Sequence, residues 1–492
     1  QPENCIQCNR CAYVCPHAAI RPVALTEEEA ANAPEGMATL PMTGMKEYKF
    51  TMTVSAYDCT GCGSCANVCP GKKGAKALAM ENMEANAGLQ KFFDYGRELP
   101  IKEEVVAKFK ETTVKGSQFK QPLLEFSGAC AGCGETPYAK LITQLFGDRM
   151  YIANATGCSS IWGNSSPSTP YTTNAKGQGP AWSNSLFEDN AEFGYGMLLA
   201  QRAIRGGLKE KIEDLVANGT NEDVKTAGQE WLDTYAVGAT NGAATEKLVA
   251  ALEACGCDKA NEILAQKDFL SKKSQWIFGG DGWAYDIGFG GVDHVLASGR
   301  DINVMVFDTE VYSNTGGQSS KSTPTGAIAQ FAAGGKETKK KDMASIAMSY
   351  GYVYVAQISM GADFNQTVKA IAEAEAYPGP SLIIAYAPCI NHGIKKGMSK
   401  AQTEEELAVK CGYWHNFRFN PAAENKFSLD SKTPDMENYM DFLNGEVRYN
   451  SLQRQNPEKA ARLFAKNESE AQARYEYLQK LITLYGADKK ED

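Results

Sequence analysis

Eight cysteines lie in two runs near the start of the chain, and both runs have the spacing C-x2-C-x2-C-x3-C-P. Three thiolates at this spacing can bind three irons of one [4Fe–4S] cluster, while the fourth thiolate of each run binds the other cluster. We therefore expect crossed ligation. The first cluster takes Cys5, Cys8, Cys11 and Cys69, and the second takes Cys59, Cys62, Cys65 and Cys15.

Zinc binding and disulfide bonding are the alternatives for these cysteines. Zinc sites rarely use this run and do not need it twice. Disulfide frameworks are typical of small secreted proteins, whereas this chain has 492 residues and no segment that resembles a signal peptide. The duplicated spacing therefore indicates electron transfer.

Composition limits the classes of partner. The net charge of −9 argues against nucleic acid as a partner. Hydrophobic residues make up 43% of the chain, which is enough for a large core. Since a membrane span needs about 20 apolar residues and the apolar runs are shorter, we expect a cytoplasmic protein with no membrane partner. The chain starts at Gln1, close to Cys5, so it looks like part of a longer polypeptide.

The pattern of apolar runs predicts an α/β fold. Short β-branched runs alternate with helical stretches, as in a parallel sheet covered by helices. We expect strands at 150–155, 275–279, 302–308, 352–358 and 381–387. The predicted domains are an α+β ferredoxin-like domain at 1–85 with a largely looped insertion at 21–57, a linker at 86–120, a parallel-sheet domain at 121–400 with a helical insertion at 208–272, and a mostly helical segment at 401–492.

Chemically useful residues follow four of the predicted strands. Cys158, the Gly-Asp-Gly at 280–282, the polar loop at 308–317 and Cys389 each come directly after a strand. Because ligands bind at the carboxyl ends of parallel strands, we expect all four motifs on one rim of the sheet.

The Gly-Asp-Gly followed by a second polar loop resembles the diphosphate-binding signature of thiamine diphosphate enzymes. Asp281 supplies a hard oxygen to Mg²⁺, and glycine lets the backbone approach the diphosphate. Many such enzymes have Asn-Asn where this chain has Asp308 and Thr309, so the other ligands are the Thr309 hydroxyl and the Val311 carbonyl. A simple turn is the alternative for an isolated Gly-Asp-Gly.

Four further cysteines suggest a third [4Fe–4S] cluster beside this site. Cys130 and Cys133 form a C-x2-C, and Cys158 and Cys389 end strands. A zinc site, a redox C-x2-C or buried thiols are the alternatives. Cys255, Cys257 and Cys411 have no visible partner set, so we expect thiols rather than ligands there.

Together these motifs resemble the single-chain pyruvate:ferredoxin (flavodoxin) oxidoreductases, or pyruvate synthases. The segments that carry the resemblance are GACAGCGETPY, ATGCSSIWGNSSPSTPYTTN, GQGPAWSNSLFEDNAEFGYGM, GGDGWAYDIGFGGVDHV, FDTEVYSNTGGQSSKSTPTGA and SLIIAYAPCINHG, with both cysteine runs. The resemblance implies the C-terminal part of a homodimeric enzyme that makes acetyl-coenzyme A and CO2 from pyruvate and coenzyme A and passes electrons to ferredoxin or flavodoxin. Upstream domains of the same enzyme would complete the thiamine site.

The resemblance also assigns roles to individual residues. Glu135 and Cys158 should touch the cofactor, and Asn314 should lie close to the bound 2-oxo acid as a catalytic residue. The residues expected to wrap the diphosphate and thiazolium are Asp281, Gly282, Trp283, Ala284, Thr309, Glu310, Val311, Tyr312, Ser313 and Asn314. Glu135 could instead cap a helix near Pro137, and Asn314 could shape its turn.

Two other functions remain open at this level. One is oxidation of a different 2-oxo acid, and the other is an electron-transfer module whose Gly-Asp-Gly loop binds no cofactor. Lysines 336, 339, 340 and 341 could attract an acidic carrier protein or the phosphates of coenzyme A, or form a solvated turn. We expect no catalytic role for the four histidines.

Overall fold

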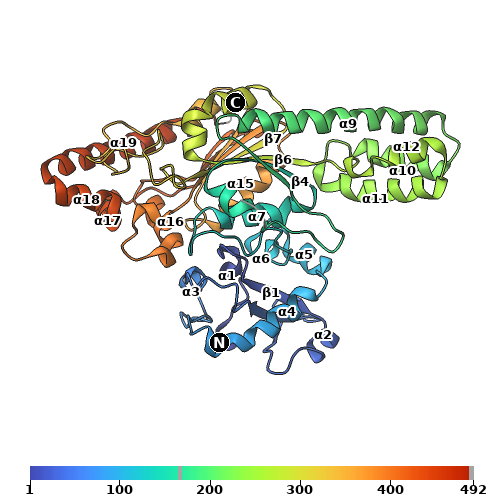
Figure 1. Cartoon of the computed structure of the whole chain (residues 1–492), viewed down its shortest axis with the longest axis horizontal. Coiled ribbons are helices and arrows are strands. Elements are labelled where there is room, and N and C mark those ends of the chain that lie inside the picture. Colours follow the sequence, from blue (N-terminus) through green and yellow to red (C-terminus); the bar gives the residue numbers. More distant parts are fainter. Residues whose placement is uncertain (165–168, 487–492) are drawn as a thin grey trace, which may run out of the picture.

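The computed structural model describes residues 1–164 and 169–486. A large mixed sheet lies at the centre, a small cysteine-rich domain packs below it, and a helical arm projects to one side (Figure 1). Within the described residues, none of the helices has the combined length and apolar character that crossing a bilayer requires.

The central sheet has eight strands in the order β11-β10-β8-β9-β7-β6-β4-β5. Its six parallel strands are β4 (Met150–Ala155), β5 (Ala181–Ser185), β6 (Ser274–Gly280), β7 (Ile302–Asp308), β8 (Tyr354–Ile358) and β9 (Pro380–Tyr386). At one edge β10 (Phe417–Phe419) and β11 (Phe427–Leu429) continue the sheet antiparallel. The five predicted strands are therefore confirmed, but the sheet is not wholly parallel.

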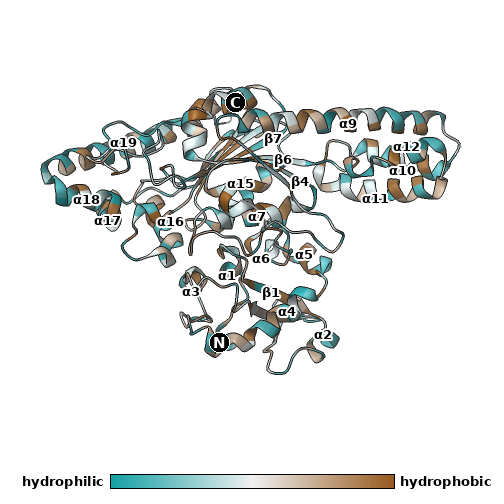
Figure 2. Cartoon of the chain, viewed as in Figure 1, coloured by the Kyte–Doolittle hydropathy of each residue, from teal (hydrophilic) through white to brown (hydrophobic). Residues whose placement is uncertain are grey.

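Both faces of the central strands are buried. Ile277, Val304 and Ile384 point into one core, and their neighbours Phe278, Met305 and Ile383 point into the other. This alternation between two apolar layers explains the continuous apolar runs in the sequence, and the central strands are brown in Figure 2. Sequence reasoning missed β5, which is half exposed, and β10 and β11, which have three residues each.

Helices cover both faces of the sheet. α7 (Thr136–Phe146) precedes the first strand of the sheet, and the helices that follow strands are α8 (Cys158–Asn164), α13 (Phe289–Ala297), α14 (Met343–Met348), α15 (Phe364–Ala376) and α16 (Ala401–Lys410). The C-terminal segment adds α17 (Tyr439–Gly445), α18 (Val447–Gln455) and α19 (Pro457–Leu484). Short 3₁₀ turns lie at Pro2–Asn4, Glu84–Leu89, Gly147–Arg149, Lys267–Phe269, Ile390–His392, Met398–Lys400 and Met436–Asn438, and a π-helical turn at Gly282–Ile287.

The cysteine-rich domain contains a small antiparallel sheet. Strands β1 (Ile20–Leu25), β2 (Leu40–Pro41) and β3 (Lys49–Val54) have the order β1-β3-β2, beside α1 (Arg10–Tyr13), α2 (Glu27–Ala31) and α3 (Ser64–Val68). Much of 21–57 is loop, as expected, but the segment also contains strands, and β1 and β3 pair along six residues. The expected linker at 86–120 is helical in part, with α4 (Gln90–Glu98), α5 (Glu103–Phe109) and α6 (Val114–Ser117). It packs Val105, Val106 and Phe119 against Phe50.

The helical arm consists of α9 (Asn190–Asn218), α10 (Glu222–Asp233), α11 (Gly238–Cys255) and α12 (Asp258–Leu264). Its first helix starts at Asn190, earlier than the insertion predicted at 208–272. Ala191 and Leu198 of α9 pack against the central sheet, whereas Leu208 and Ile212 belong to a separate core around Trp231. The arm therefore has a core of its own beyond the sheet (Figure 1).

Candidate iron–sulfur and cofactor sites

The two cysteine runs come together in the crossed arrangement. Cys5, Cys8 and Cys11 line a cavity of about 300 Å³ together with Cys69 of the other run. Burial is the main cause that raises the pKa of Cys5, and the charges of Cys8 and Cys69 add to it. The space among these four sulfurs suits a shared cluster, as the spacing predicts.

The second set combines three cysteines of the second run with Cys15 of the first run. Burial raises the pKa of Cys65 to about 12, and the next causes are the charges of Cys15, Cys62 and Cys59. Burial also raises the pKa of Cys59, and Cys15 contributes there as well. Four thiols whose charges disfavour one another need a strong cationic partner to ionise together, which is what an iron–sulfur core supplies.

Left-handed residues shape both cysteine loops. Asn9 has φ 60°, and Gly61 and Gly63 have φ 68° and 79°. Backbone amides also turn toward sulfur, since the Gln7 and Ala77 N–H groups donate to Cys5 and Cys69 at 3.4 Å. Such N–H···S bonds tune the potential of a cluster.

Across 1–164 and 169–486, no three His, Cys, Asp or Glu side chains gather in a way that suits a single metal ion. A cubane differs from such an ion because each thiolate binds a different iron, so the sulfurs surround the cluster. The open cavity among Cys5, Cys8, Cys11 and Cys69 has this character.

A third set of cysteines meets at the rim of the large sheet. The loop of Cys130 and Cys133 abuts the end of β9, where the Gly134 N–H donates to the Pro388 carbonyl at 3.1 Å. A Cβ on Gly134 would lie 2.5 Å from the Pro388 nitrogen, so only glycine allows this approach.

Burial raises the pKa of Cys133 and of Cys158, with Glu135 as the next cause for each. Burial also raises the pKa of Cys389, to about 11, and the charges of Glu135 and Cys130 add to it.

The three expected Mg²⁺ ligands also converge. The Thr309 hydroxyl lies 3.0 Å from both Asp281 Oδ1 and the Val311 carbonyl oxygen, and all three residues are buried. Burial and the nearby Asp308 raise the pKa of Asp281 well above its usual range. Carboxylate, hydroxyl and carbonyl oxygens are the donors that Mg²⁺ prefers, and a cation there would offset the cost of the buried acidic pair. The residues present therefore fit the ion.

A hydrogen bond joins this loop to the third cysteine set. The Ser313 hydroxyl donates to Cys158 Sγ at 3.1 Å. The amide of Asn391 donates to Cys389 Sγ at 3.5 Å and to the Ser313 carbonyl at 3.3 Å. The expected diphosphate loop and the expected third cluster are therefore neighbours.

Glu135 is buried beside these cysteines. Although it occupies the N-cap position of α7, its side chain makes no capping hydrogen bond. Instead Oε2 accepts a 2.7 Å bond from the Trp162 indole, and burial raises its pKa to about 7. This favours a role at the rim over helix capping.

Glu310 points away from the rim. Its carboxylate pairs with Lys340 at 2.8 Å and with Arg448 at 2.8 Å, which together with its other partners lowers its pKa to about 2 despite burial. Its backbone, held at φ 61°, is also engaged: the N–H donates to Asp308 at 3.1 Å, and the carbonyl accepts from the Thr323 hydroxyl at 2.5 Å.

The other predicted contacts are divided between the interior and the surface. Trp283 and Ala284 are buried at the start of the π-helical turn, and a Cβ on Gly282 would lie 2.5 Å from the Tyr312 ring. Asn314 is exposed on the same loop as Ser313. Its proximity to a substrate stays a prediction.

Three of the four lysines at 336–341 bind groups in or beside the expected cofactor loop. Lys336 donates to the Ser320 carbonyl at 2.8 Å, Lys340 pairs with Asp308 at 2.9 Å, and Lys341 donates to the Tyr285 carbonyl. Neither a carrier-binding patch nor a solvated turn describes these three, and only Lys339 is exposed. Sequence reasoning also missed Ser320, whose hydroxyl donates to Asp281 at 2.6 Å.

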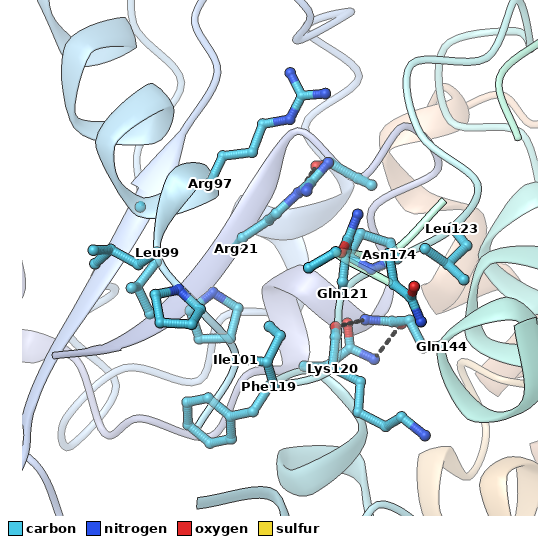
Figure 3. A pocket seen from close by; sticks show the side chains of 18 of the residues that line it. Arg21, Arg97, Leu99, Ile101, Phe119, Lys120, Gln121, Leu123, Gln144 and Asn174 are labelled. Carbon is cyan, nitrogen blue, oxygen red and sulfur yellow. Dashed lines mark hydrogen bonds between the residues drawn. The ribbon is translucent and has the colours of Figure 1, made fainter. Parts of the chain in front are cut away.

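A larger cavity lies elsewhere, between the cysteine-rich domain and the large sheet. It has a volume of about 740 Å³ and is lined by β1, the end of α4 and residues 118–123 (Figure 3). Arg21 and Arg97 on its wall both pair with Glu125, so their charges are already satisfied. We interpret this cavity as the seam between two domains, distinct from the cofactor rim.

Two family models match the chain. Residues 4–73 match a 4Fe-4S dicluster domain, and residues 251–385 match the C-terminal TPP-binding domain of thiamine pyrophosphate enzymes. Together with the site geometry, these matches define the class: an iron–sulfur protein with a thiamine-diphosphate domain.

Curated relatives narrow this class. The chain is 55% identical over 98% of its length to a pyruvate-flavodoxin oxidoreductase from Klebsiella pneumoniae and covers 41% of that protein. It is 56% identical over 98% of its length to a pyruvate:ferredoxin oxidoreductase from Moorella thermoacetica and covers 42% of it. Over nearly all of its length the chain is therefore similar to pyruvate:flavodoxin (ferredoxin) oxidoreductases, and it spans about two fifths of these relatives.

Proposed function

We propose that this chain is the iron–sulfur and diphosphate-binding part of an enzyme that oxidises pyruvate to acetyl-coenzyme A and CO2. Electrons leave through three [4Fe–4S] clusters to ferredoxin or flavodoxin. The names of the relatives at 55% and 56% identity support the substrate and the carrier. The proposal includes a cytoplasmic homodimer and further domains of the same polypeptide.

The observation that carries the proposal is the bond between Ser313 and Cys158. Ser313 lies two residues after Val311, an expected Mg²⁺ ligand, and Cys158 belongs to the expected third cluster. When bound, thiamine diphosphate supplies the carbanion chemistry that decarboxylation of a 2-oxo acid needs. A redox centre at this distance would accept electrons directly from the cofactor.

The chain's own residues have distinct parts in this scheme. Asp281, Thr309 and the Val311 carbonyl would hold Mg²⁺ and through it the diphosphate. Buried Glu135, whose pKa of about 7 allows either protonation state near neutral pH, faces the same sulfurs. Tight packing of Gly282 against Tyr312 keeps the loop rigid.

Iron analysis of anaerobically purified chain tests the number of clusters. Three clusters require about twelve irons per chain, whereas an electron-transfer module with only the crossed pair holds about eight. The double variant Cys158→Ser, Cys389→Ser should lose about four irons and leave the dicluster domain intact. A wild-type count of about eight, unchanged in the variant, would refute the third cluster.

Calorimetry with thiamine diphosphate and Mg²⁺ tests the cofactor site separately. Substrate choice needs the full-length enzyme, in which acyl-coenzyme A formation from a panel of 2-oxo acids should favour pyruvate. Preference for 2-oxoglutarate or a bulky oxo acid would contradict the proposed substrate but not the cofactor site.

A further inference from the structure

Two cysteines outside the proposed cluster sites meet at the turn between α11 and α12. Cys255 is the last residue of α11, and Cys257 immediately precedes α12. Their sulfur atoms lie 3.0 Å apart. This separation places the two thiols in direct contact.

Gly256 creates this contact. It has φ 61° and ψ 9°, the left-handed conformation that ends many helices, and its N–H donates to the Leu252 carbonyl at 3.1 Å. A Cβ at this position would meet no described atom within 4 Å. Glycine is therefore favoured by the backbone angle rather than by space, and the turn brings both sulfurs to the same side.

The pair is accessible from solvent. Cys257 is exposed and Cys255 is half-buried, on the helical arm and away from the rim of the sheet (Figure 1). Cys411, the remaining cysteine outside the proposed cluster sites, is buried in the core, where its thiol donates to the Ala408 carbonyl at 3.6 Å. Reagents in solution can therefore reach the pair much more readily than Cys411.

The two thiols differ chemically. The hydrogen bond between them lowers the pKa of Cys257 and raises that of Cys255. A thiol that ionises more easily is the nucleophile in thiol–disulfide exchange, and its neighbour resolves the mixed disulfide.

We propose that Cys255-Gly256-Cys257 is a reversible thiol–disulfide site that reacts with small-molecule disulfides. The Cys257 thiolate attacks one sulfur of the small disulfide, a mixed disulfide forms, and the first small thiolate leaves. The Cys255 thiolate then attacks the Cys257 sulfur, and the second small thiolate leaves. The small disulfide gains two electrons, the protein loses two electrons and two thiol protons, and an intramolecular S–S bond forms.

The surroundings favour exchange over a structural disulfide. A ring closed across one intervening residue is strained, and strained or exposed disulfides are the easily reduced ones. The arm already has a core that includes Leu248 and Leu252 of α11 and Ala260 and Ile263 of α12. Oxidation should therefore change the turn without being required for folding of the arm.

Oxidised glutathione is the probe for this proposal. The protein with its iron–sulfur clusters bound is treated with oxidised glutathione under anaerobic conditions. Its remaining thiols are then blocked with N-ethylmaleimide under denaturing conditions. The tryptic peptide between Lys247 and Lys259 is examined by mass spectrometry. This peptide contains only the two cysteines of the pair, so cluster cysteines do not enter the readout. We expect a peptide two hydrogen atoms lighter and unlabelled, which dithiothreitol returns to the doubly labelled form.

Two matched variants distinguish the roles of the thiols. Cys255→Ser should stop at the mixed disulfide between Cys257 and glutathione, because the resolving thiol is missing. Cys257→Ser should react more slowly, and neither variant should change the iron content. A wild-type peptide that keeps two labels, or that stops at the mixed disulfide, would overturn the proposal.

Discussion

At the scale of single residues, Asp281 has the largest expected effect on cofactor binding. It is fully buried and accepts hydrogen bonds from Ser320 at 2.6 Å and from the Thr309 backbone at 3.2 Å. Asp281→Asn keeps the shape but removes the charge that a divalent ion needs. Loss of even an outer partner typically weakens metal affinity by about 10-fold to 100-fold, so we expect at least this loss for thiamine diphosphate with Mg²⁺ by calorimetry.

Asp286→Asn is the matched control for Asp281→Asn. Asp286 pairs with Lys321 at 3.0 Å near the same loop but is not an expected Mg²⁺ ligand. Its substitution should leave the affinity nearly unchanged. Equal losses in both variants would contradict the assignment of Asp281.

His415 makes folding sensitive to acid. Burial, with Arg474 as the next cause, lowers its pKa to about 3, and neither ring nitrogen has a hydrogen-bond partner within the described residues. Between its unfolded pKa of about 6.5 and about 3, only the unfolded chain binds the proton. The stability from this group is therefore lost as the pH falls through that window, at about 1.4 kcal/mol per pH unit.

His415→Phe should reduce this acid sensitivity and leave the part that comes from the buried His392, whose pKa burial also lowers to about 3. The ring stacks on Tyr475 with centroids 5.7 Å apart, and phenylalanine can fill the same space without buried polar atoms. Chemical denaturation between pH 4 and pH 7 should show a shallower loss of stability than in the wild type. The exposed His294 is the control, and His294→Gln should leave the steep profile in place.

At the scale of elements, the Cys133 loop must lie directly against the end of β9. Gly134→Ala would place a Cβ 2.5 Å from the Pro388 nitrogen, and overpacking of this kind costs about 1–3 kcal/mol. We expect the variant to lose the irons of the third cluster while the dicluster domain keeps its own, as measured by iron analysis. Gly128→Ala on the same loop, where a Cβ would meet no described atom within 4 Å, should retain the full count.

Helix α7 connects the rim to the cysteine-rich domain. It begins directly after Glu135, and the buried Lys140 of this helix donates to the carbonyls of Ala12 and Tyr13 in α1. Burial lowers the pKa of Lys140 to about 8, and Cys15 and Cys11 are the nearby charges that raise it. A cation in this position would stabilise the more negative, reduced form of either crossed cluster.

Lys140→Met should therefore lower the reduction potentials of the dicluster domain. A redox titration followed by electron paramagnetic resonance measures the change. Lys120→Met removes a lysine that pairs with Glu111 near the surface and should leave the potentials near those of the wild type. Unchanged potentials in Lys140→Met would show that its role is limited to holding the two domains together.

At the scale of the whole molecule, the proposed centres follow one another through the structure. The Asp281 site neighbours Cys158 through Ser313, Cys133 precedes α7, and α7 contacts α1 between Cys11 and Cys15. Figure 1 shows α7 between the large sheet and the cysteine-rich domain. Under the proposed function, this order would give electrons a path from the rim to the outer domain.

The helical arm lies outside this path. The arm has a separate core. Its two ends lie close together, since Arg205 donates a 3.0 Å hydrogen bond to the Leu270 carbonyl. Replacing 208–269 with a short glycine linker should therefore leave iron content and thiamine diphosphate binding unchanged, as measured by iron analysis and calorimetry. Loss of either property would show that the arm supports the sites.

The sequence by itself determined the local chemistry of this protein. The cysteine spacing predicted the ligand sets, because three of the four ligands in each set lie within one short loop. The geometry of such a loop depends on few residues. The apolar runs predicted the central strands, and the motifs that follow them were expected on one rim because parallel strands all end at the same edge.

Only the tertiary structure decided which distant residues complete the sites. It turned Glu310 toward Lys340 and Arg448, placed the Lys140 ammonium against the carbonyls of α1, and joined β10 to β8. These contacts link residues far apart in the chain, and their partners are chosen by packing and by the need to pair buried charges. No local pattern of residue types carries that information.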